Sequence, residues 1–467
     1  MRRDERKPSH VRFRTTFRNC VYDLLRSRGY TETESDTEWE LAWVDKDWIR
    51  EHFDGQYLSD AQRINHFRNH YELTRKDNLV KNLKRTQRHL LREGRDDEAA
   101  AYDFFPGTYV LPADYGLFVE EFKTHPPGSI WIMKPTGSAQ GKGIFLFNKL
   151  SQVTDWKKDY KWKGDVQKEK EVAAYVVQRY IENPQLIGGK KFDLRLYVLV
   201  TSYSPLTVYI YRAGFCRFSG YRYNTHAKNL GDTYVHLTNA AIQKTAPGYD
   251  ASAGCKWPLT AYKLYMIAKY GVQTTDKMFD AVEELVVNTL LSVQKVMIND
   301  KHCFEMYGYD ILVDDTLKPW LIEVNASPSI SADTMQDYDL KFGLLDDVFT
   351  VVDMETKLGG AVEPTVGGFD LIYNNGHVRP DKGMQYSSRL GNAVDRERQL
   401  KALHAKHSKR RSTKQLPLSI FATPAVRGFG EAGLMDADDD LHGLQSVLVA
   451  RTSSMAKVWA CMCVLGR

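Results

Sequence analysis

Short apolar runs, separated by glycine-bearing and polar turns, recur along most of this sequence and predict a mixture of strands and helices. Residues 11–55 alternate such runs with turns and predict a small α/β unit. Residues 59–93 follow a helical pattern, with Leu79, Leu83, Leu90 and Leu91 available for its apolar side. Residues 276–298 place apolar side chains near a period of 3.6, and we assign these side chains to the core.

The middle of the chain is dominated by strand patterns. The run SIWIMKP (129–135) predicts a buried strand, and the turn TGSAQGKG (136–143) joins it to a second strand, IFLFN. VAAYVVQRYI (172–181) predicts a third strand, and FDLRLYVLV with LTVYIYRAGFCRFS (192–219) predicts an antiparallel pair with alternating residues. FEMYGYDILVDDTLKPWLIEVNASPS (304–329) predicts two further strands joined by a turn.

The pattern changes beyond about residue 358, where glycines and polar residues become more frequent. Residues 401–414 (KALHAKHSKRRSTK) are basic and poor in apolar side chains, which is typical of a linker or tail. We therefore expect residues 380–467 to be poorly ordered, and we favour a solvated tail over a binding segment.

Composition narrows the class of protein. The 467 residues are 43% hydrophobic and 26% charged, which predicts a soluble globular protein with two or three packed subdomains. The six cysteines form no paired CxxC motifs with zinc-ligand spacing, so we expect a reducing compartment. The start MRRDERKPSH lacks the apolar stretch of a signal peptide, and no run of apolar residues is long enough for a membrane span.

The net charge of +5 is small, but its distribution is uneven. From Arg63 to Arg95 there are ten basic residues and three acidic ones. Such a stretch is either a solvated helix surface or a site for an anionic partner, and the sequence leaves the two interpretations about even.

Candidate chemistry begins with three oxygen-bearing side chains near the end of the organised region. Asp310 lies on one predicted strand, while Glu323 and Asn325 are two apart on the next and share one face. Magnesium prefers hard oxygen ligands and combines one or two carboxylates with nucleotide phosphates. The three side chains therefore predict the metal end of a magnesium–nucleotide site.

Basic residues placed before this segment fit the phosphate end of such a site. Lys134 ends a strand beside the glycine loop, where Gly141 lets the backbone approach phosphate oxygens. No GxxxxGK[ST] motif is present, which disfavours a P-loop enzyme. Arg195 and Arg217 are candidates to hold a transferring phosphate or a substrate carboxylate, because a guanidinium pairs with either in a bidentate manner.

Five motifs, taken in order, resemble the tubulin tyrosine ligase-like family over residues 15 to 360, and its ciliary glutamylase subgroup in particular. They are WIMKPTGSAQGKGI, QRYI, KKFDLRLYVLV, HLTNAAIQK and GYDILVDDTLKPWLIEVNASPS. The resemblance implies an α+β ATP-grasp fold with a small N-terminal α/β domain and a poorly ordered C-terminal tail. We expect an N-terminal domain at 1–75, a central domain at 76–190, a C-terminal domain with the magnesium site at 191–360, and an extension and basic tail at 361–467.

The resemblance also implies roles for individual residues. Arg195 and Glu323 would be catalytic, and Asp310, Glu323 and Asn325 would bind magnesium. Arg217 would bind the carboxylate of the incoming amino acid, assisted by Lys256 and Lys341, and Lys76 would lie near nucleotide or tubulin. The residues expected to bind ATP are Lys134, Gln140, Gly141, Gln178, Arg179, Tyr180, Ile181, Lys191, Phe192, Asp193, Thr238 and Asn239.

The implied reaction is tubulin polyglutamylation, in which ATP activates a glutamate side chain of an acidic tubulin tail as an acyl phosphate and free L-glutamate attacks it. Accessory subunits are expected partners, nucleic acid and membrane are not, and the expected location is the cytoplasm and cytoskeleton, at the axoneme or basal body of a cilium or flagellum. Three alternatives stay open: a glycine or tyrosine ligase of the same fold, a microtubule-binding scaffold with a weak nucleotide site, and a ligase acting on a small molecule. The basic stretch weighs modestly against the last of these.

Overall fold

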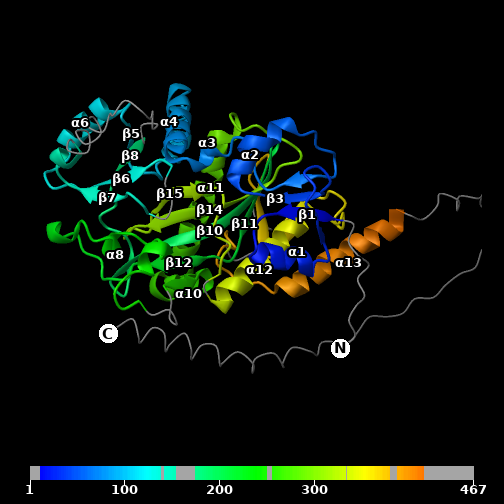
Figure 1. Cartoon of the computed structure of the whole chain (residues 1–467). Coiled ribbons are helices and arrows are strands. Elements are labelled where there is room, and N and C mark those ends of the chain that lie inside the picture. The colour runs from blue at the N-terminus through cyan, green and yellow to red at the C-terminus, as the bar shows by residue number, and fades with distance from the viewer. Residues whose placement is uncertain are drawn as a thin grey trace, which may run out of the picture. The chain divides into compact units, whose positions relative to one another are not determined.

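The computed structural model of the chain (Figure 1) describes residues 11–137, 141–153, 174–249, 255–332, 334–378 and 387–414. The chain divides into a unit of residues 1–400 and a unit of residues 401–467. Helices and strands are mixed throughout the first unit, which confirms the α+β class. None of the helices within the described ranges has the length and apolar character that a membrane crossing requires.

The N-terminal region forms the small α/β unit that the sequence predicts. Its four strands lie in the order β2-β1-β3-β4 and are all parallel, and α1 (Cys20–Ser27) and α2 (Lys46–His52) connect them. The strands are β1 (Arg12–Thr15), β2 (Thr31–Glu32), β3 (Leu41–Trp43) and β4 (Arg63–Ile64), and a short 3-10 helix covers Phe53–Gly55.

The helical stretch predicted over 59–93 is shorter than expected. Only α3 (Tyr71–Thr74) and α4 (Lys76–Arg92) are helical, because residues 63–64 instead pair with β3 as β4. Leu79, Leu83 and Leu90 of α4 are buried, whereas Leu91 is exposed, so three of the four predicted leucines form the apolar side. The short helix α5 (Asp96–Ala100) follows.

A second sheet carries the strands that flank the glycine loop. It is antiparallel, with the order β5-β8-β6-β7, and α6 (Tyr115–Thr124) packs against it through Phe118. The strands are β5 (Thr108–Leu111), β6 (Trp131–Pro135), β7 (Phe145–Phe147) and β8 (Tyr175–Arg179), so all three strands predicted here are confirmed.

The third sheet is the largest and is built around β10 (Lys190–Tyr203), which pairs antiparallel with β11, β12 and β14. The predicted antiparallel pair is confirmed, but its residues do not alternate between buried and exposed. Leu194 and Leu196 face one core while Tyr197 and Leu199 face another, because helices cover both faces of this sheet. The other strands are β9 (Leu186–Ile187), β11 (Leu206–Tyr211), β12 (Phe215–Phe218), β13 (Lys256–Pro258), β14 (Glu305–Val313), β15 (Pro319–Asn325), β16 (Thr365–Val366) and β17 (Phe369–Asn374).

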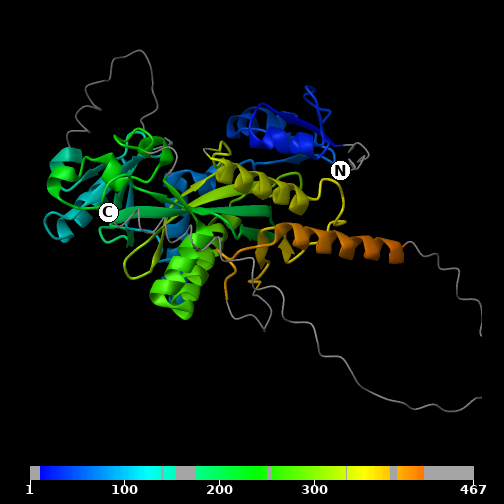
Figure 2. The same ribbon diagram turned by 90° about the horizontal axis from the view of Figure 1, so that it is seen from below.

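Helices on the two faces of this sheet complete the first unit. Figure 2 shows α10 (Leu259–Tyr270) on one side of the long strand and α12 (Met335–Val352) on the other. The helix predicted over 276–298 is confirmed as α11 (Val272–Gln294), which begins and ends four residues earlier. Shorter helices cover Ala227–Asn229, α8 (Thr233–His236) and α9 (Ala240–Gln243).

Two expectations about the C-terminal part need correction. Strand β17 pairs with β11, so the large sheet continues beyond the expected domain boundary at residue 360. The expectation that residues 380–467 are poorly ordered is wrong for residues 396–414, which form the helix α13 (Arg396–Lys414). Its basic side chains occur at helical spacing without any glycine or proline to interrupt them, which explains why the run is helical.

Candidate functional site

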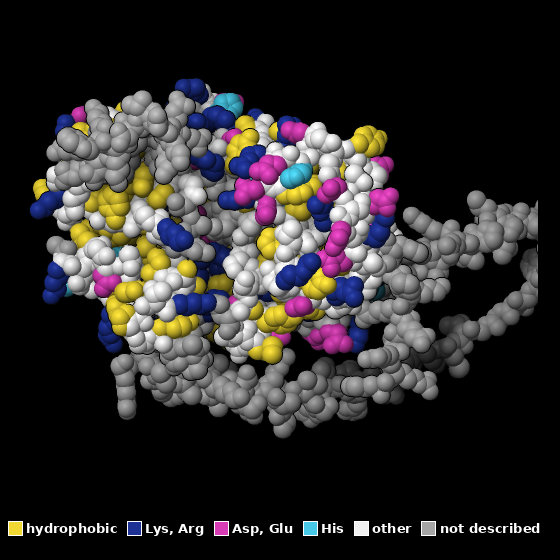
Figure 3. All heavy atoms as spheres, in the orientation of Figure 1, with side chains coloured by type: hydrophobic (Ala, Val, Ile, Leu, Met, Phe, Trp, Pro, Cys, Tyr) yellow, Lys and Arg dark blue, Asp and Glu magenta, His cyan; other side chains and the backbone are white. Residues whose placement is uncertain are grey.

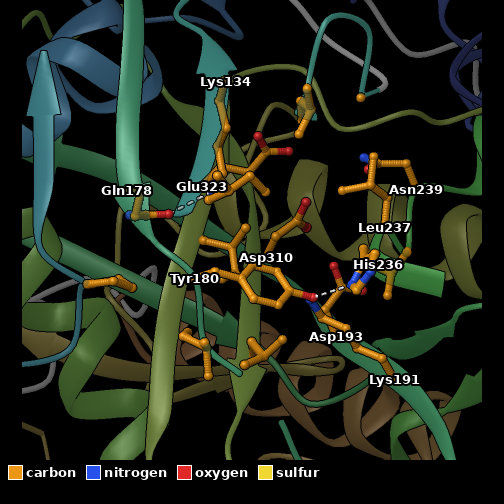
Figure 4. A pocket seen from close by; sticks show the side chains of 18 of the residues that line it. Lys134, Gln178, Tyr180, Lys191, Asp193, His236, Leu237, Asn239, Asp310 and Glu323 are labelled. Carbon is orange, nitrogen blue, oxygen red and sulfur yellow. Dashed lines mark hydrogen bonds between the residues drawn. The ribbon is translucent and has the colours of Figure 1, made fainter. Parts of the chain in front are cut away.

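A pocket in the first unit lies where the second sheet meets the large one (Figure 4), and its empty volume is about 790 Å³. Its walls come from β6, β8, β10, β12, β14 and β15 and from the segment between α8 and α9. It brings together fourteen of the residues that the sequence selected: Lys76, Lys134, Gly141, Gln178, Arg179, Tyr180, Ile181, Lys191, Asp193, Arg217, Thr238, Asn239, Asp310 and Glu323.

Strand register explains why charged residues far apart in the sequence meet on one face. Asp193 and Arg195 are two apart on β10 and therefore point to the same side of the sheet. Arg217 lies opposite Asp193, Asp310 lies opposite Arg195, and Glu323 lies opposite Asp310 on the next strand. Directly opposed residues of antiparallel strands share a face, so the five side chains form one charged group.

Asp310 lies at the centre of this group and is almost fully buried. Arg195 donates to it through Nε at 2.6 Å and Nη2 at 3.1 Å, and Nη2 of Arg217 lies 2.7 Å from Oδ2. Burial opposes ionisation of Asp310, but the two guanidinium groups outweigh burial and hold the pKa of this carboxyl well below its usual value. Asp310 is therefore a carboxylate at any physiological pH.

The expectation that Arg195 acts on the transferred group does not fit its position. Its side chain does not line the pocket, and its Nε and Nη2 both donate to Asp310. The structure thus gives Arg195 a positioning role behind Asp310. Arg217 does line the pocket, and it holds Asp193 in a bidentate pair through Nε at 2.8 Å and Nη2 at 2.5 Å.

Glu323 and Asn325 complete the predicted metal end of the pocket. Nδ2 of Asn325 lies 3.4 Å from Oε1 of Glu323 and 3.5 Å from Oδ2 of Asp310, so the three side chains are in contact. Nζ of Lys76, from the first turn of α4, lies 3.0 Å from Oε2 of Glu323. No group of three or more histidine, cysteine or acidic side chains in the described residues could hold a metal ion. A metal here would need Asn325 and nucleotide oxygens as ligands beside the two carboxylates.

Lys134 lies near Glu323 in the pocket and is held by a chain of polar groups. Its Nζ donates to Oε1 of Gln178 at 2.7 Å, Nε2 of Gln178 donates to Oγ1 of Thr108 at 2.9 Å, and that hydroxyl donates to the carbonyl of Pro106 at 2.7 Å. Burial lowers the pKa of Lys134 to about 8, with Glu323 opposing the change. A buried amine of this kind becomes fully charged when anionic oxygens reach it.

A second chain of hydrogen bonds fixes Lys191 beside the hinge residues. Nζ of Lys191 donates to the hydroxyl of Tyr180 at 2.9 Å, and that hydroxyl lies 3.0 Å from Nδ1 of His236. Because Nε2 of His236 lies 3.1 Å from the carbonyl of Asn229, the proton belongs on Nε2, and Tyr180 donates to Nδ1. Burial lowers the pKa of Lys191 to about 7 despite the nearby Asp193. Burial and then Lys191 lower the pKa of His236 to about 4, so its ring is neutral.

The glycine loop approaches the same pocket at Gly141, where φ is +77°. A Cβ atom at this position would lie 2.5 Å from Cδ1 of Ile242 and 3.2 Å from Oδ1 of Asn239, so only glycine fits. The loop thus closes against the segment after α8. Gln140, which the sequence also selected, lies outside the described residues.

Phe192 is the one predicted nucleotide contact that the structure contradicts. Its side chain is buried in the largest core cluster and packs edge-on against Tyr262, with ring centroids 5.4 Å apart. The reason is the strand alternation of β10, which sends Lys191 and Asp193 into the pocket and Phe192 to the other face.

Lys256 and Lys341 lie outside the pocket lining but meet each other on Asp337. Their Nζ atoms are 3.0 Å and 2.9 Å, respectively, from Oδ2 of Asp337. Lys256 is opposite Arg217 across β12 and β13, so this cationic group continues the charged face of the sheet. The three residues expected to hold the incoming amino acid are therefore neighbours.

Sequence reasoning missed the apolar side of the pocket. Ile132, Leu237, Leu312 and Ile322 line it together with Pro106, and they come from five separate segments. Apolar residues on strands are ordinary core candidates, so nothing in the local sequence distinguishes these from others. His236 belongs to the motif HLTNAAIQK, and only the structure shows that it lines the pocket.

A pocket with two buried lysines, apolar walls and a pair of carboxylates at one end has the composition of a site for a magnesium nucleotide. The sequence signature of the Tubulin-tyrosine ligase family matches residues 55–358, which include the described residues of this pocket. The chain belongs to this family and is an ATP-dependent ligase.

Individual relatives are similar over most of the chain. A Bos taurus protein named probable tubulin polyglutamylase TTLL9 is 47% identical over 436 residues, which cover 86% of this chain and 94% of that protein. A Caenorhabditis elegans protein named probable tubulin polyglutamylase ttll-9 is 44% identical, over 84% of this chain and 94% of its own length. A Tetrahymena thermophila protein named probable alpha-tubulin polyglutamylase Ttll1 is 43% identical, over 78% and 93%.

Proposed function

We propose that this protein is a tubulin polyglutamylase, which uses ATP to join L-glutamate to the side-chain carboxylates of glutamate residues in the acidic C-terminal tails of tubulin. The observation that carries the proposal is the charged face of the large sheet, where Asp310 and Glu323 lie beside Arg217 in one pocket. The names of the relatives, which are 43–47% identical to the chain, support the same reaction. Within this proposal the second and large sheets are the two halves of an ATP-grasp fold.

The donor groups of the pocket fit a magnesium nucleotide. Asp310, Glu323 and Asn325 would hold magnesium, since they present two carboxylates and an amide within contact of one another. Lys134 and Lys191 would bind phosphate oxygens, and the nucleotide would supply the phosphoryl group that activates the acceptor carboxylate. Lys76 contacts Oε2 of Glu323, so Oε1, which lies beside Asn325, is the oxygen that a metal ion would use while this ion pair persists.

The chain's own residues would then orient the two carboxylate-bearing substrates. Arg217 lines the pocket and Lys256 and Lys341 lie next to it, and these three basic side chains suit the α-carboxylate of a free amino acid. Asp310, held by Arg195, stays ionised and keeps the metal end of the site fixed while negative charge develops on the reacting group.

The experiment is incorporation of labelled glutamate into purified tubulin with and without ATP, in the presence of candidate accessory subunits. Glu323→Gln should lower the rate at least roughly 100-fold, because it removes a metal ligand. Asp315→Asn is the matched control, since Asp315 is exposed on the turn between the same two strands. Mass spectrometry of the tubulin tails after reaction with mixed amino acids identifies the donor.

Three outcomes would contradict the proposal. Incorporation of glycine or tyrosine in place of glutamate would overturn the donor assignment. Full activity of Glu323→Gln would overturn the site. Microtubule binding that persists in this variant, without turnover by the wild-type protein, would favour a scaffold.

Our proposal extends to location at the axoneme or basal body of cilia, which the resemblance to the ciliary glutamylase subgroup supports. Fluorescence microscopy of the tagged full-length protein in ciliated cells tests it. A signal spread through the cytoplasm, without enrichment at cilia, would refute this part alone.

A further inference from the structure

A groove between α4 and α11 lies apart from the pocket described above, and four cationic side chains and one histidine line it. The cations are Arg85, Arg88, Arg92 and Lys295, and the histidine is His89. The groove has an empty volume of about 1080 Å³, and no acidic residue is among the described residues that line it. Figure 3 shows basic and histidine side chains gathered over the end of the molecule where α4 lies in Figure 1.

Most of these cations lack an acidic partner of their own. Arg85, Arg92 and Lys295 are exposed and have no carboxylate within ion-pair distance among the described residues. His89 alone has such a contact, 3.2 Å to Glu93. Nearby Arg95 shows the contrasting arrangement, because it pairs with both Glu93 and Glu98. The groove therefore holds positive charge that no acidic side chain of the described residues neutralises.

Helical spacing makes this arrangement unfavourable for the free protein. Arg85 is three residues from Arg88, and Arg88 is four residues from Arg92, so three cationic side chains adjoin along one face of α4. Like charges at these spacings destabilise a helix, and a bound anionic partner would remove the repulsion.

The shape of the groove also strengthens the electrostatic field of its cations. Leu291 and Val296 of the α11 wall are partly buried apolar side chains that face the cations across the groove. Charges of one sign lining a concave surface with a low-dielectric wall attract an opposite charge more strongly than the same charges on a convex helix. A plain solvated helix surface would lack this second wall.

The position of the groove on α4 separates it from the ligase pocket. Lys76 and Val80 lie on the side of α4 that faces the pocket region, whereas Arg85 and Arg92 lie on the opposite side of the helix. Along the helix axis, Lys76 and Arg92 are about 24 Å apart at 1.5 Å per residue. A segment bound in the groove therefore leaves the pocket open for a different part of the same partner.

We propose that the groove is a docking site for an acidic polypeptide segment of the protein acceptor, outside the residue that reacts. This inference rests on the proposed function for the identity of the acceptor, but the binding itself needs no turnover. The occupant is taken to be a polypeptide because the groove has an apolar wall that can hold aliphatic parts of side chains, beside cations that pair with carboxylates.

The test measures binding of a fluorescein-labelled decaglutamate peptide to the full-length protein by fluorescence anisotropy at low and high salt. The groove variant is Arg85→Glu/Arg88→Glu/Arg92→Glu. The control is Arg26→Glu/Lys46→Glu/Lys277→Glu, which reverses three exposed charges on other helices and changes the net charge equally. Glu323→Gln provides a third background in which the ligase pocket is altered and the groove is intact.

We expect the groove variant to bind at least roughly tenfold more weakly at low salt, with a smaller difference at high salt because the charges are exposed. The control and Glu323→Gln should bind like the wild type. In the ligase assay the groove variant should raise KM for tubulin and leave kcat and KM for ATP unchanged. If glutamate ligation fails altogether while groove-dependent binding persists, the proposed function is wrong and the docking site stands.

Two results would overturn the docking proposal. Equal loss of affinity in the groove variant and the control would mean that net charge alone drives binding. A groove variant that keeps its affinity for decaglutamate but loses affinity for vesicles of anionic lipid or for RNA would show that the occupant is not a polypeptide. Circular dichroism and thermal unfolding of each variant distinguish these results from a failure to fold.

Discussion

Nucleotide binding should be accompanied by proton uptake, because burial favours the uncharged amine of Lys191 in the free protein. Burial lowers the pKa of Lys191 to about 7, so above this pH most of the free protein carries a neutral amine there. Bound phosphate oxygens favour the ammonium form and raise the pKa again. The bound state then holds more protons than the free state, so affinity for the nucleotide must fall as pH rises above about 7.

The magnitude follows from the fraction of protein that is protonated before binding. With a pKa of about 7, half of the Lys191 side chains are charged at pH 7 but only about 3% at pH 8.5. If only the charged form binds well, the dissociation constant rises roughly 15-fold over this range, which equals about 1.6 kcal/mol. Lys134, whose pKa burial lowers to about 8, adds a smaller effect in the same direction.

Isothermal titration calorimetry with magnesium and a non-hydrolysable ATP analogue measures both quantities. Titrations at pH 8 in two buffers of different ionisation enthalpy should give an uptake of about one proton from Lys191 alone. Lys191→Met should remove most of this uptake and flatten the pH dependence. Lys228→Met should change neither, because the exposed side chain of Lys228 does not line the pocket. Wild-type binding without proton uptake, or with affinity independent of pH between 7 and 8.5, would refute the reasoning.

The remaining predictions concern stability and are read from chemical denaturation. Asp310→Asn should lower the free energy of unfolding by about 3–5 kcal/mol, since it leaves the buried guanidinium of Arg195 uncompensated; a loss under about 1 kcal/mol would contradict this. Gly308→Ala should lower the free energy of unfolding by about 1–3 kcal/mol, because the new Cβ would lie 2.9 Å from Cβ of Pro328. Unchanged stability would mean that the segment around Pro328 moves to make room for the Cβ. Burial raises the pKa of Asp347 to about 7, so between about pH 4 and pH 7 the folded state binds more protons than the unfolded state. The free energy of unfolding should therefore fall by up to about 1.4 kcal/mol per pH unit as the pH rises through this range. Asp347→Asn should remove this slope, and an unaltered pH profile would show that another group causes it.

Much of the fold follows from patterns that are local in the sequence. The strands around Lys134 and Gln178 and the hairpin that carries Asp310 and Glu323 stand where their apolar runs predict them. The helical pattern before residue 93 predicts too long a helix, because residues 63–64 form a strand only through pairing with β3, which their own sequence neighbours do not indicate. Composition is misleading at α13. Its few apolar residues indicate a tail, although most of its residue types favour a helix.

The sequence by itself determined which chemical groups the site contains, because the spacing of Asp310, Glu323 and Asn325 on two strands already places them on one face. Only the tertiary structure decided how these groups are used. In the folded chain, Phe192 is buried in the core and Arg195 binds Asp310 outside the pocket lining. The apolar wall of the pocket is assembled from five separate segments. The physical reason is that side chains alternate between the two faces of a strand every second residue, which the local sequence shows. The partners of a buried charge depend instead on the register between strands that are distant in the sequence.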